Sequence, residues 1–264
     1  MRRLDRGRVA VPPPLRDGDD TTPAPRLAWY RDLYKTDGKT IKDRWNERDV
    51  ALDEESSTRR ALAELSGQLC AYCEKRLERS WQVDHFLPQA EFPWLSYCWD
   101  NLLPTCPGCN SRKRAFVPLP LPQAMLVDPV LAAERPGAQP FRKAELLPTL
   151  GDRLVDPSFD DPAEHLRFIP EVPAWEGTTR IGQRTVQRLF VDKSHAIHWQ
   201  QLSETVCVLL KHRSPDEVVE AIVTLSGCPT VFRACVAYWR EMLAPVLSAP
   251  ASDPAPAADP TSLA

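Results

Sequence analysis

Apolar residues between positions 54 and 66 recur at the three- and four-residue spacing of an amphipathic helix. Ala61, Leu62 and Leu65 form a short apolar stripe that follows a run of charged and polar residues. Gly67 lies just beyond this stripe, at a position where glycine commonly ends a helix. The pattern therefore predicts a short helix that ends near Gly67.

A longer stretch with the same spacing fills residues 177–245 and predicts three or four helices. Ser214-Pro215-Asp216 has the composition of a helix start. The apolar positions that carry the pattern include Ile181, Val186, Leu189, Phe190, Ile197, Leu202, Val206, Leu209, Leu210, Val218, Ile222, Val231, Phe232, Val236 and Trp239.

Proline interrupts the chain outside these helical regions, with 27 prolines against only 10 glycines. Residues 118–176 are so rich in proline that long helices are excluded, which predicts a wrapping segment of loops and short strands. Residues 1–27 combine basic residues with a proline run and predict an extended arm, and residues 246–264 predict a disordered tail. Residues 28–117 then hold the first helix and a cysteine-rich block.

The composition of the 264-residue chain limits what it can bind. Its hydrophobic content of 43% suffices for a buried core, but its formal net charge is −3, so nucleic-acid binding would need a local basic surface or a partner. No apolar run approaches the roughly 18 residues of a membrane span, and no secretory signal follows the charged N-terminus. We therefore expect a cytoplasmic protein without a membrane partner, whose cysteines stay reduced.

Two Cys-x-x-Cys pairs stand out among the eight cysteines: Cys70 with Cys73, and Cys106 with Cys109. Each pair presents two sulfurs from one tight turn, and two such turns supply the four tetrahedral ligands that structural Zn²⁺ prefers. The pairs are separated by 32 residues, more than in a simple zinc ribbon, so a further element is inserted between them. The alternative is four buried thiols with accidental spacing.

The insert contains a short predicted strand, Val83-Asp84-His85-Phe86, and Asn101 lies sixteen residues after His85. Asn110 directly follows the last cysteine and precedes a possible helix. Taken alone, an Asp-His pair is more often an ordinary polar contact, and Asn110 is a good helix cap. Their position within the two-cysteine-pair frame makes the combination specific.

These residues resemble the HNH endonuclease family over about fifty residues. The resemblance rests on Cys70-x-x-Cys73, Asp84-His85, Asn101, Cys106-x-x-Cys109-Asn110 and Lys113. It implies an α+β fold, in which a small ββα-metal module with zinc knuckles is embedded in a mainly helical chain with a Pro-rich loop segment. Because the last motif position is Asn110, the chain is similar to the His-Asn-Asn variant of the family.

The resemblance also implies roles for individual residues. Asp84 and Asn110 would hold a catalytic cation through oxygen, which favours Mg²⁺ or Mn²⁺ over a catalytic zinc. His85 would act as the general base that takes a proton from the attacking water. Asn101 would fix the loop and the orientation of the histidine ring.

Three consecutive basic residues, Arg112, Lys113 and Arg114, follow Asn110 and are candidates for contacts to nucleic-acid phosphates. A solvated helix face is an equally good interpretation. Over residues 70–117, six Lys and Arg residues stand against five Asp and Glu residues, an excess that supports modest non-specific binding at most.

A wider resemblance links the chain to bacterial antiphage HNH proteins, the nuclease subunits of Septu systems and their retron-associated relatives. It rests on the basic N-terminal arm, Cys-x-Tyr-Cys-Glu at 70–74, Asp-His-Phe-x-Pro-Gln at 84–89, Leu-Val-Asp-Pro at 154–157 and the helical C-terminal region. Such nucleases work with an ATPase subunit that gates them. The resemblance implies such a partner here, with residues 177–245 as the candidate binding region.

The sequence leaves other functions open. The leading hypothesis is a metal-dependent endonuclease that hydrolyses phosphodiester bonds of DNA. A stand-alone restriction-type HNH nuclease, a non-catalytic zinc module that binds nucleic acid or protein, and a toxin-like nuclease that acts on RNA remain alternatives.

Overall fold

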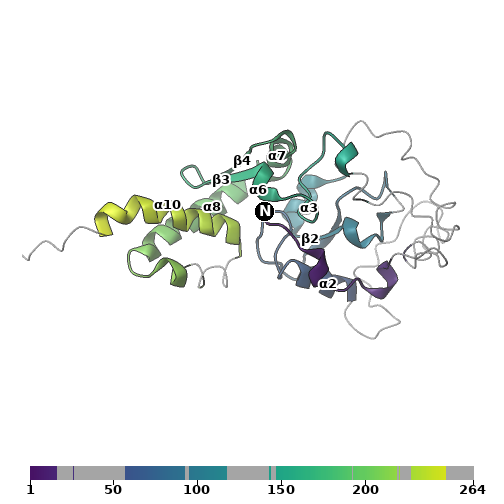
Figure 1. The fold of residues 1–264 in the computed structure, drawn as a ribbon, viewed down its shortest axis with the longest axis horizontal. Coiled ribbons are helices and arrows are strands. Elements are labelled where there is room, and N and C mark those ends of the chain that lie inside the picture. Colours follow the sequence, from purple (N-terminus) through teal and green to yellow (C-terminus); the bar gives the residue numbers. More distant parts are fainter. Residues whose placement is uncertain are drawn as a thin grey trace, which may run out of the picture.

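The computed structural model describes residues 1–16, 26, 57–92, 95–117, 143, 147–191, 193–218, 220 and 227–247 (Figure 1). The disordered tail and the first half of the Pro-rich segment predicted from the sequence lie almost wholly outside these residues. Within the described residues, no helix combines the length and apolar character needed to cross a membrane.

A two-stranded sheet and one helix form the centre of the cysteine-rich block. Strand β1 (Gln82–His85) pairs antiparallel with β2 (Leu102–Thr105), so that His85 lies opposite Leu102. Helix α3 (Pro107–Lys113) follows β2 directly and contacts β1, while α2 (Ser57–Leu65) packs against β2. All four residues of β2 are buried because helices cover the sheet. This arrangement confirms the predicted α+β class with a small ββα module.

The ends of α2 and α3 follow from local sequence. Helix α2 ends just before Gly67, whose positive φ of 61° is a backbone conformation that glycine adopts without strain. Helix α3 starts with Pro107 at its first position, and the Cys106 sulfur accepts a hydrogen bond from the Cys109 amide at 3.4 Å. Cys106, the first cysteine of the second pair, therefore also caps the helix that contains Cys109.

A second small unit lies between this module and the helical end of the molecule (Figure 1). Helix α6 (Pro162–His165) leads into the hairpin of β3 (Leu166–Ile169) and β4 (Ala174–Gly177), followed by α7 (Arg180–Thr185) and a π-helical turn, η7 (Val186–Phe190). A Cβ atom at Gly182 would collide with the carbonyl oxygen of His165, so this close approach requires glycine. The η7 turn contacts α3 and β3 contacts α10, which joins the unit to both neighbours.

The C-terminal end is a helix pair, α8 (Lys193–Leu210) and α10 (Pro229–Leu247), which lie side by side (Figure 1). Between them, Ser214 and Glu217 form a capping box at the predicted helix start, with the Ser214 hydroxyl 2.7 Å from the Glu217 carboxylate. An aromatic cluster of Phe168, Trp175, Phe190 and Trp199 fastens α8 to the hairpin, with ring centroids 5.5–6.5 Å apart.

The first sixteen residues of the predicted arm lie against the core. They contain the short 3-10 turns η1 (Arg6–Arg8) and η2 (Pro13–Leu15). Met1, Leu4 and Leu15 are buried, and the Arg6 guanidinium donates to the carbonyls of Trp99 and Leu102 at 2.7 Å each. Through these buried side chains and the Arg6 hydrogen bonds, the segment is held against the core. Its low apolar content did not predict these contacts.

Trp199 should be a principal stabilising residue of the helical end, because its side chain is only 1% exposed and meets three other aromatic rings. We expect Trp199→Ala to lower the free energy of unfolding by about 3–5 kcal/mol. Ile197→Ala on the same helix is the control, because Ile197 is 58% exposed and its loss should cost no more than about 0.5 kcal/mol. Urea denaturation of the two variants measures the difference, and equal losses would contradict this account of the core.

Candidate active site and zinc centre

The four cysteines of the two Cys-x-x-Cys pairs converge on one point, with all their sulfur atoms within 4.8 Å of one another. The Sγ atoms of Cys73 and Cys106 are 3.7 Å apart. Tetrahedral Zn²⁺ with Zn–S bonds of about 2.3 Å would place its sulfur ligands about 3.8 Å apart. The donor set and its spacing therefore fit a structural zinc ion held by Cys70, Cys73, Cys106 and Cys109.

Hydrogen bonds among the thiols at this centre shift their pKa values in opposite directions. Hydrogen bonds from the thiols of Cys109, Cys70 and Cys73 lower the pKa of Cys106 far below its usual range. The hydrogen bond to Cys106 correspondingly raises the pKa of Cys109. Among these thiols the shifts favour the thiolate at Cys106, and the thiolate is the form that binds a metal.

The first cysteine turn is tied to the sheet through its backbone. The Ala71 amide donates to the Pro104 carbonyl of β2 at 2.8 Å, and the Glu74 amide donates to Cys70 at 3.0 Å. The second turn directly follows β2, so one strand positions both halves of the zinc centre. The remaining cysteines lie outside the four-sulfur group: Cys98, Cys228 and Cys235 are buried and Cys207 is half-buried. The described residues contain no disulfide.

His85 stands at the end of β1, half-buried, with Nε2 2.9 Å from the carbonyl oxygen of Ser96. A carbonyl accepts only, so Nε2 must carry the ring proton. In the neutral imidazole the lone pair then resides on Nδ1. For the neutral imidazole, which is the form a general base needs, this contact selects both the tautomer and the ring orientation.

Asn101 is fully buried at the end of the 3-10 turn η4 (Trp99–Asn101), directly before β2, and binds the loop that follows β1. Its Oδ1 accepts from the Leu87 amide at 2.8 Å, while Nδ2 donates to the carbonyls of Leu87 at 2.9 Å and Leu95 at 3.2 Å. Because Leu95 precedes Ser96, Asn101 fixes the segment that orients His85. Asn101 therefore links the loop after β1 to the residue next to Ser96.

Asp84 lies on the opposite side of β1 from His85, because successive side chains alternate along a strand. Its carboxylate is only 5% exposed. Oδ2 accepts from the Tyr72 hydroxyl at 2.6 Å, and Oδ1 accepts from the Lys113 ammonium at 3.0 Å. Burial, together with Asp84, raises the pKa of Tyr72 well above its usual range, which keeps its hydroxyl a donor.

Asn110 and Lys113 lie one turn apart on α3 but make different contacts. The Asn110 amide donates to the Gln82 side chain at 2.7 Å. Lys113 is 1% exposed and also donates to the His85 carbonyl at 2.7 Å. Lys113 was a candidate for contacts to nucleic-acid phosphates. Its ammonium instead lies inside the module, paired with the Asp84 carboxylate.

The arrangement does not fit a divalent cation on Asp84 as it stands. The oxygen chemistry of Asp84 and Asn110 suits Mg²⁺ or Mn²⁺. The ammonium of Lys113, however, already neutralises Asp84, and a cation bound there would meet a like charge at close range. Metal binding at Asp84 would therefore require Lys113 to leave the carboxylate.

The other two basic candidates are more accessible. Arg114 is exposed at the end of α3 and has a positive φ of 51°. Arg112 is half-buried, and its guanidinium lies near Gly108 on the preceding turn. Arg188 from η7 donates to the Lys113 carbonyl at 3.1–3.2 Å and so satisfies the end of this helix.

Three residues of the site were not singled out from the sequence: Tyr72, Gln82 and Ser96. Tyr72 lies between the two cysteines of the first pair and within the Cys-x-Tyr-Cys-Glu run, but neither feature indicated a contact with Asp84. Ser96 contributes its backbone carbonyl, which any residue type could supply. The contact of Gln82 with Asn110 depends on the strand–helix packing, which the local pattern does not specify.

The family model of the HNH endonucleases matches residues 70–116. This segment contains both cysteine pairs, His85, Asn101 and Asn110. Residues 70–116 are therefore an HNH endonuclease domain, as the motif resemblance implied, and such a domain implies a divalent metal.

Two relatives are Septu proteins PtuB. One, from Bacillus thuringiensis, is 46% identical over 56 residues, which are 20% of this chain and 22% of the relative. The other, from Bacillus mycoides (strain KBAB4), is 25% identical over 194 residues, which are 67% of this chain and 57% of the relative. The matches thus span less than two thirds of these relatives' own length. No solved structure matches the chain significantly.

The zinc centre makes a stoichiometric prediction. The chain purified without chelator should contain one zinc per molecule by elemental mass spectrometry, and Cys109→Ser should lose it and unfold at lower temperature. Cys207→Ser is the matched control, because Cys207 lies outside the four-sulfur cluster. Equal zinc contents in the two variants would exclude the proposed ligand set.

Proposed function

We propose that this protein is a metal-dependent HNH endonuclease that hydrolyses phosphodiester bonds. The observation that carries the proposal is the orientation of His85 within an HNH domain. The Ser96 carbonyl holds Nε2 at 2.9 Å, so Nδ1 carries the lone pair needed to accept a proton.

The chemistry proposed for His85 is general-base catalysis. Nδ1 takes a proton from a water molecule, and the water oxygen attacks the phosphorus as the bond to the leaving sugar oxygen breaks. The electron pair of that bond stays on the sugar oxygen, which a solvent water then protonates. The proton remains on the imidazolium, which Ser96 continues to orient through Nε2. Asn101 keeps the Ser96 segment in place during the reaction through its bonds to Leu87 and Leu95.

The catalytic cation is proposed to be Mg²⁺ or Mn²⁺, because the candidate ligands Asp84 and Asn110 offer oxygen atoms. In the structure these side chains are engaged by Lys113 and Gln82. We therefore propose that Lys113 competes with the cation for Asp84.

DNA is the proposed substrate, with Arg112 and Arg114 as the phosphate-contact candidates that remain accessible. RNA is the competing substrate, and digestion of plasmid and of transfer RNA in parallel separates the two. Because basic residues only slightly outnumber acidic ones in the domain, we propose that a partner contributes to nucleic-acid affinity.

The likeness to Septu proteins PtuB supports a role in antiphage defence. We further propose an ATPase partner that gates the nuclease and binds the helical region 177–245. Cleavage by the isolated chain at physiological salt, unchanged by a partner, would instead favour a stand-alone nuclease.

Replacing His85 tests the catalytic proposal. His85→Ala should lower the cleavage rate by about 10²–10⁴-fold, the usual contribution of a general base. The control is His212→Ala, because His212 is exposed outside the domain and its loss should leave cleavage unchanged. Equal activity of wild type and His85→Ala would favour the non-catalytic zinc module, once zinc content shows that both are folded.

Competition between Lys113 and the cation for Asp84 predicts opposite effects for two variants. Lys113→Met should lower the Mn²⁺ concentration needed for half-maximal cleavage, because it removes the competing positive charge. Asp84→Asn should raise that concentration, because it removes the negative ligand. A shift in the same direction for both variants, measured by titration in chelator-treated buffer, would refute the competition.

A further inference from the structure

Four consecutive backbone carbonyls, those of residues 99–102, all accept hydrogen bonds. Arg6 donates to Trp99 and to Leu102 at 2.7 Å. The Phe86 amide donates to Asn101 at 2.8 Å, and the Lys143 ammonium donates to Asp100 at 2.6 Å. Two of the three donor residues are cations from outside the matched HNH segment: the half-buried Arg6, 93–96 residues from its acceptors, and the fully buried Lys143, 43 residues from its acceptor.

Lys143 is fully buried and has a partner of opposite charge. Its Nζ lies 2.5 Å from the Asp156 carboxylate, and both side chains are 0% exposed. The ammonium also lies 4.4 Å from the Phe86 ring centroid and 5.1 Å from that of Phe159. Burial lowers the pKa of Lys143, and the charge of Asp156 opposes this shift.

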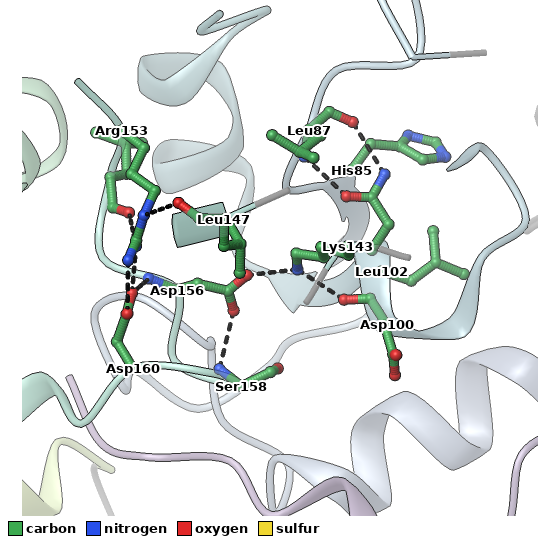
Figure 2. A network of polar contacts seen from close by, with 12 residues as sticks. His85, Leu87, Asp100, Leu102, Lys143, Leu147, Arg153, Asp156, Ser158 and Asp160 are labelled. Carbon is green, nitrogen blue, oxygen red and sulfur yellow. Dashed lines mark hydrogen bonds and ion pairs between the residues drawn. The ribbon is translucent and has the colours of Figure 1, made fainter. Parts of the chain in front are cut away.

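Asp156 is itself held by its neighbours. Its Oδ1 accepts from the Ser158 amide at 2.9 Å, and its own amide donates to Asp160 at 2.8 Å. Arg153 binds Asp160 through two nitrogens at 2.5 and 2.8 Å. Figure 2 shows this network leading from Arg153 through Asp160 and Asp156 to Lys143 and Asp100, with His85 beyond Leu87.

The segment fixed by Lys143 is the one that orients His85. Asp100 adjoins Asn101, whose side chain binds Leu87 and Leu95, and Ser96 next to Leu95 binds the His85 ring. Leu102 pairs with His85 across the sheet. A displacement of residues 99–102 would therefore disturb two contacts of His85. One is the hydrogen bond of its ring to Ser96, and the other is its pairing with Leu102.

We propose that Lys143 and Asp156 are positioning residues of the nuclease site. Lys143 holds the Asp100 carbonyl and thereby fixes the Asn101 turn and the His85 ring, while Asp156 supplies the charge that allows Lys143 to be buried there. This inference rests on the proposed nuclease function.

A double substitution separates positioning from stability. Lys143→Met keeps an unbranched apolar chain against Phe86 and Phe159 but leaves Asp156 as a buried unpaired charge, which lowers stability. Adding Asp156→Asn removes that charge and keeps the oxygen that accepts from Ser158, so the melting temperature should recover. The Asp100 carbonyl still lacks its donor in the double variant. Asp152→Asn is the matched control, because it neutralises an aspartate whose partner is Arg184.

The double variant should cleave with kcat reduced about 100-fold, the cost of a misplaced catalytic group, while KM stays nearly unchanged. The control should retain the wild-type kcat. Recovery of kcat together with the melting temperature would overturn the positioning role, because the pair would then act on stability alone.

Amide hydrogen exchange of the full chain decides the inference independently of activity. Residues 95–102 should exchange faster in the double variant than in the control at equal melting temperature. If the wild type does not cleave with Mg²⁺ or Mn²⁺, the nuclease function fails, but faster exchange would still establish that Lys143 fixes this turn. Unchanged exchange would overturn the inference even in an active enzyme.

Discussion

Convergence of four cysteine sulfurs is the constraint on which the rest of the HNH domain depends. The sheet has only two strands of four residues each, which is too little to be stable alone. The zinc centre joins the turn before β1 to the start of α3, and the Ala71–Pro104 hydrogen bond aligns the first turn with β2. A metal that closes this loop restricts the unfolded chain, so a minimal sheet can hold His85 at a defined place.

Buried polar groups also help to hold His85 at a defined place. Asn101, Lys143 and Asp156 are all 0% exposed, and each has hydrogen-bond or ion-pair partners in the structure. A buried donor or acceptor without a partner costs about 1–3 kcal/mol, so alternative loop conformations that break these contacts are disfavoured. Such contacts specify one geometry more sharply than apolar packing does, which suits a loop that orients the imidazole proposed as the general base.

Local sequence was sufficient for the features that follow from spacing along the chain. The α+β class, the four-sulfur centre and the grouping of His85 with Asn101 all lie within one motif, where the order of residues dictates which ones meet. Contacts between residues far apart in the sequence could not be predicted from local sequence. Arg6 and Lys143 reach residues 99–102 from distant segments, and nothing in their neighbourhoods distinguishes a buried cation from a surface one. Lys113 shows the same limit at short range, because a basic run beside Asn110 suggests phosphate contacts, whereas packing turns its ammonium towards Asp84.

The region that follows the module contacts it at two places: the turn of the first cysteine pair and the end of α3. The amide and hydroxyl of Thr230, at the start of α10, bind Glu74, the residue directly after the first cysteine pair. Arg188 binds the last turn of α3 through the Lys113 carbonyl. The matched HNH segment is therefore packed as part of a larger structure, because its zinc turn and its helix end both find hydrogen-bond partners outside it. A ligand that displaced α10 or η7 would act directly on the zinc turn and on the helix that carries Asn110 and Lys113, since packed elements transmit displacement instead of absorbing it.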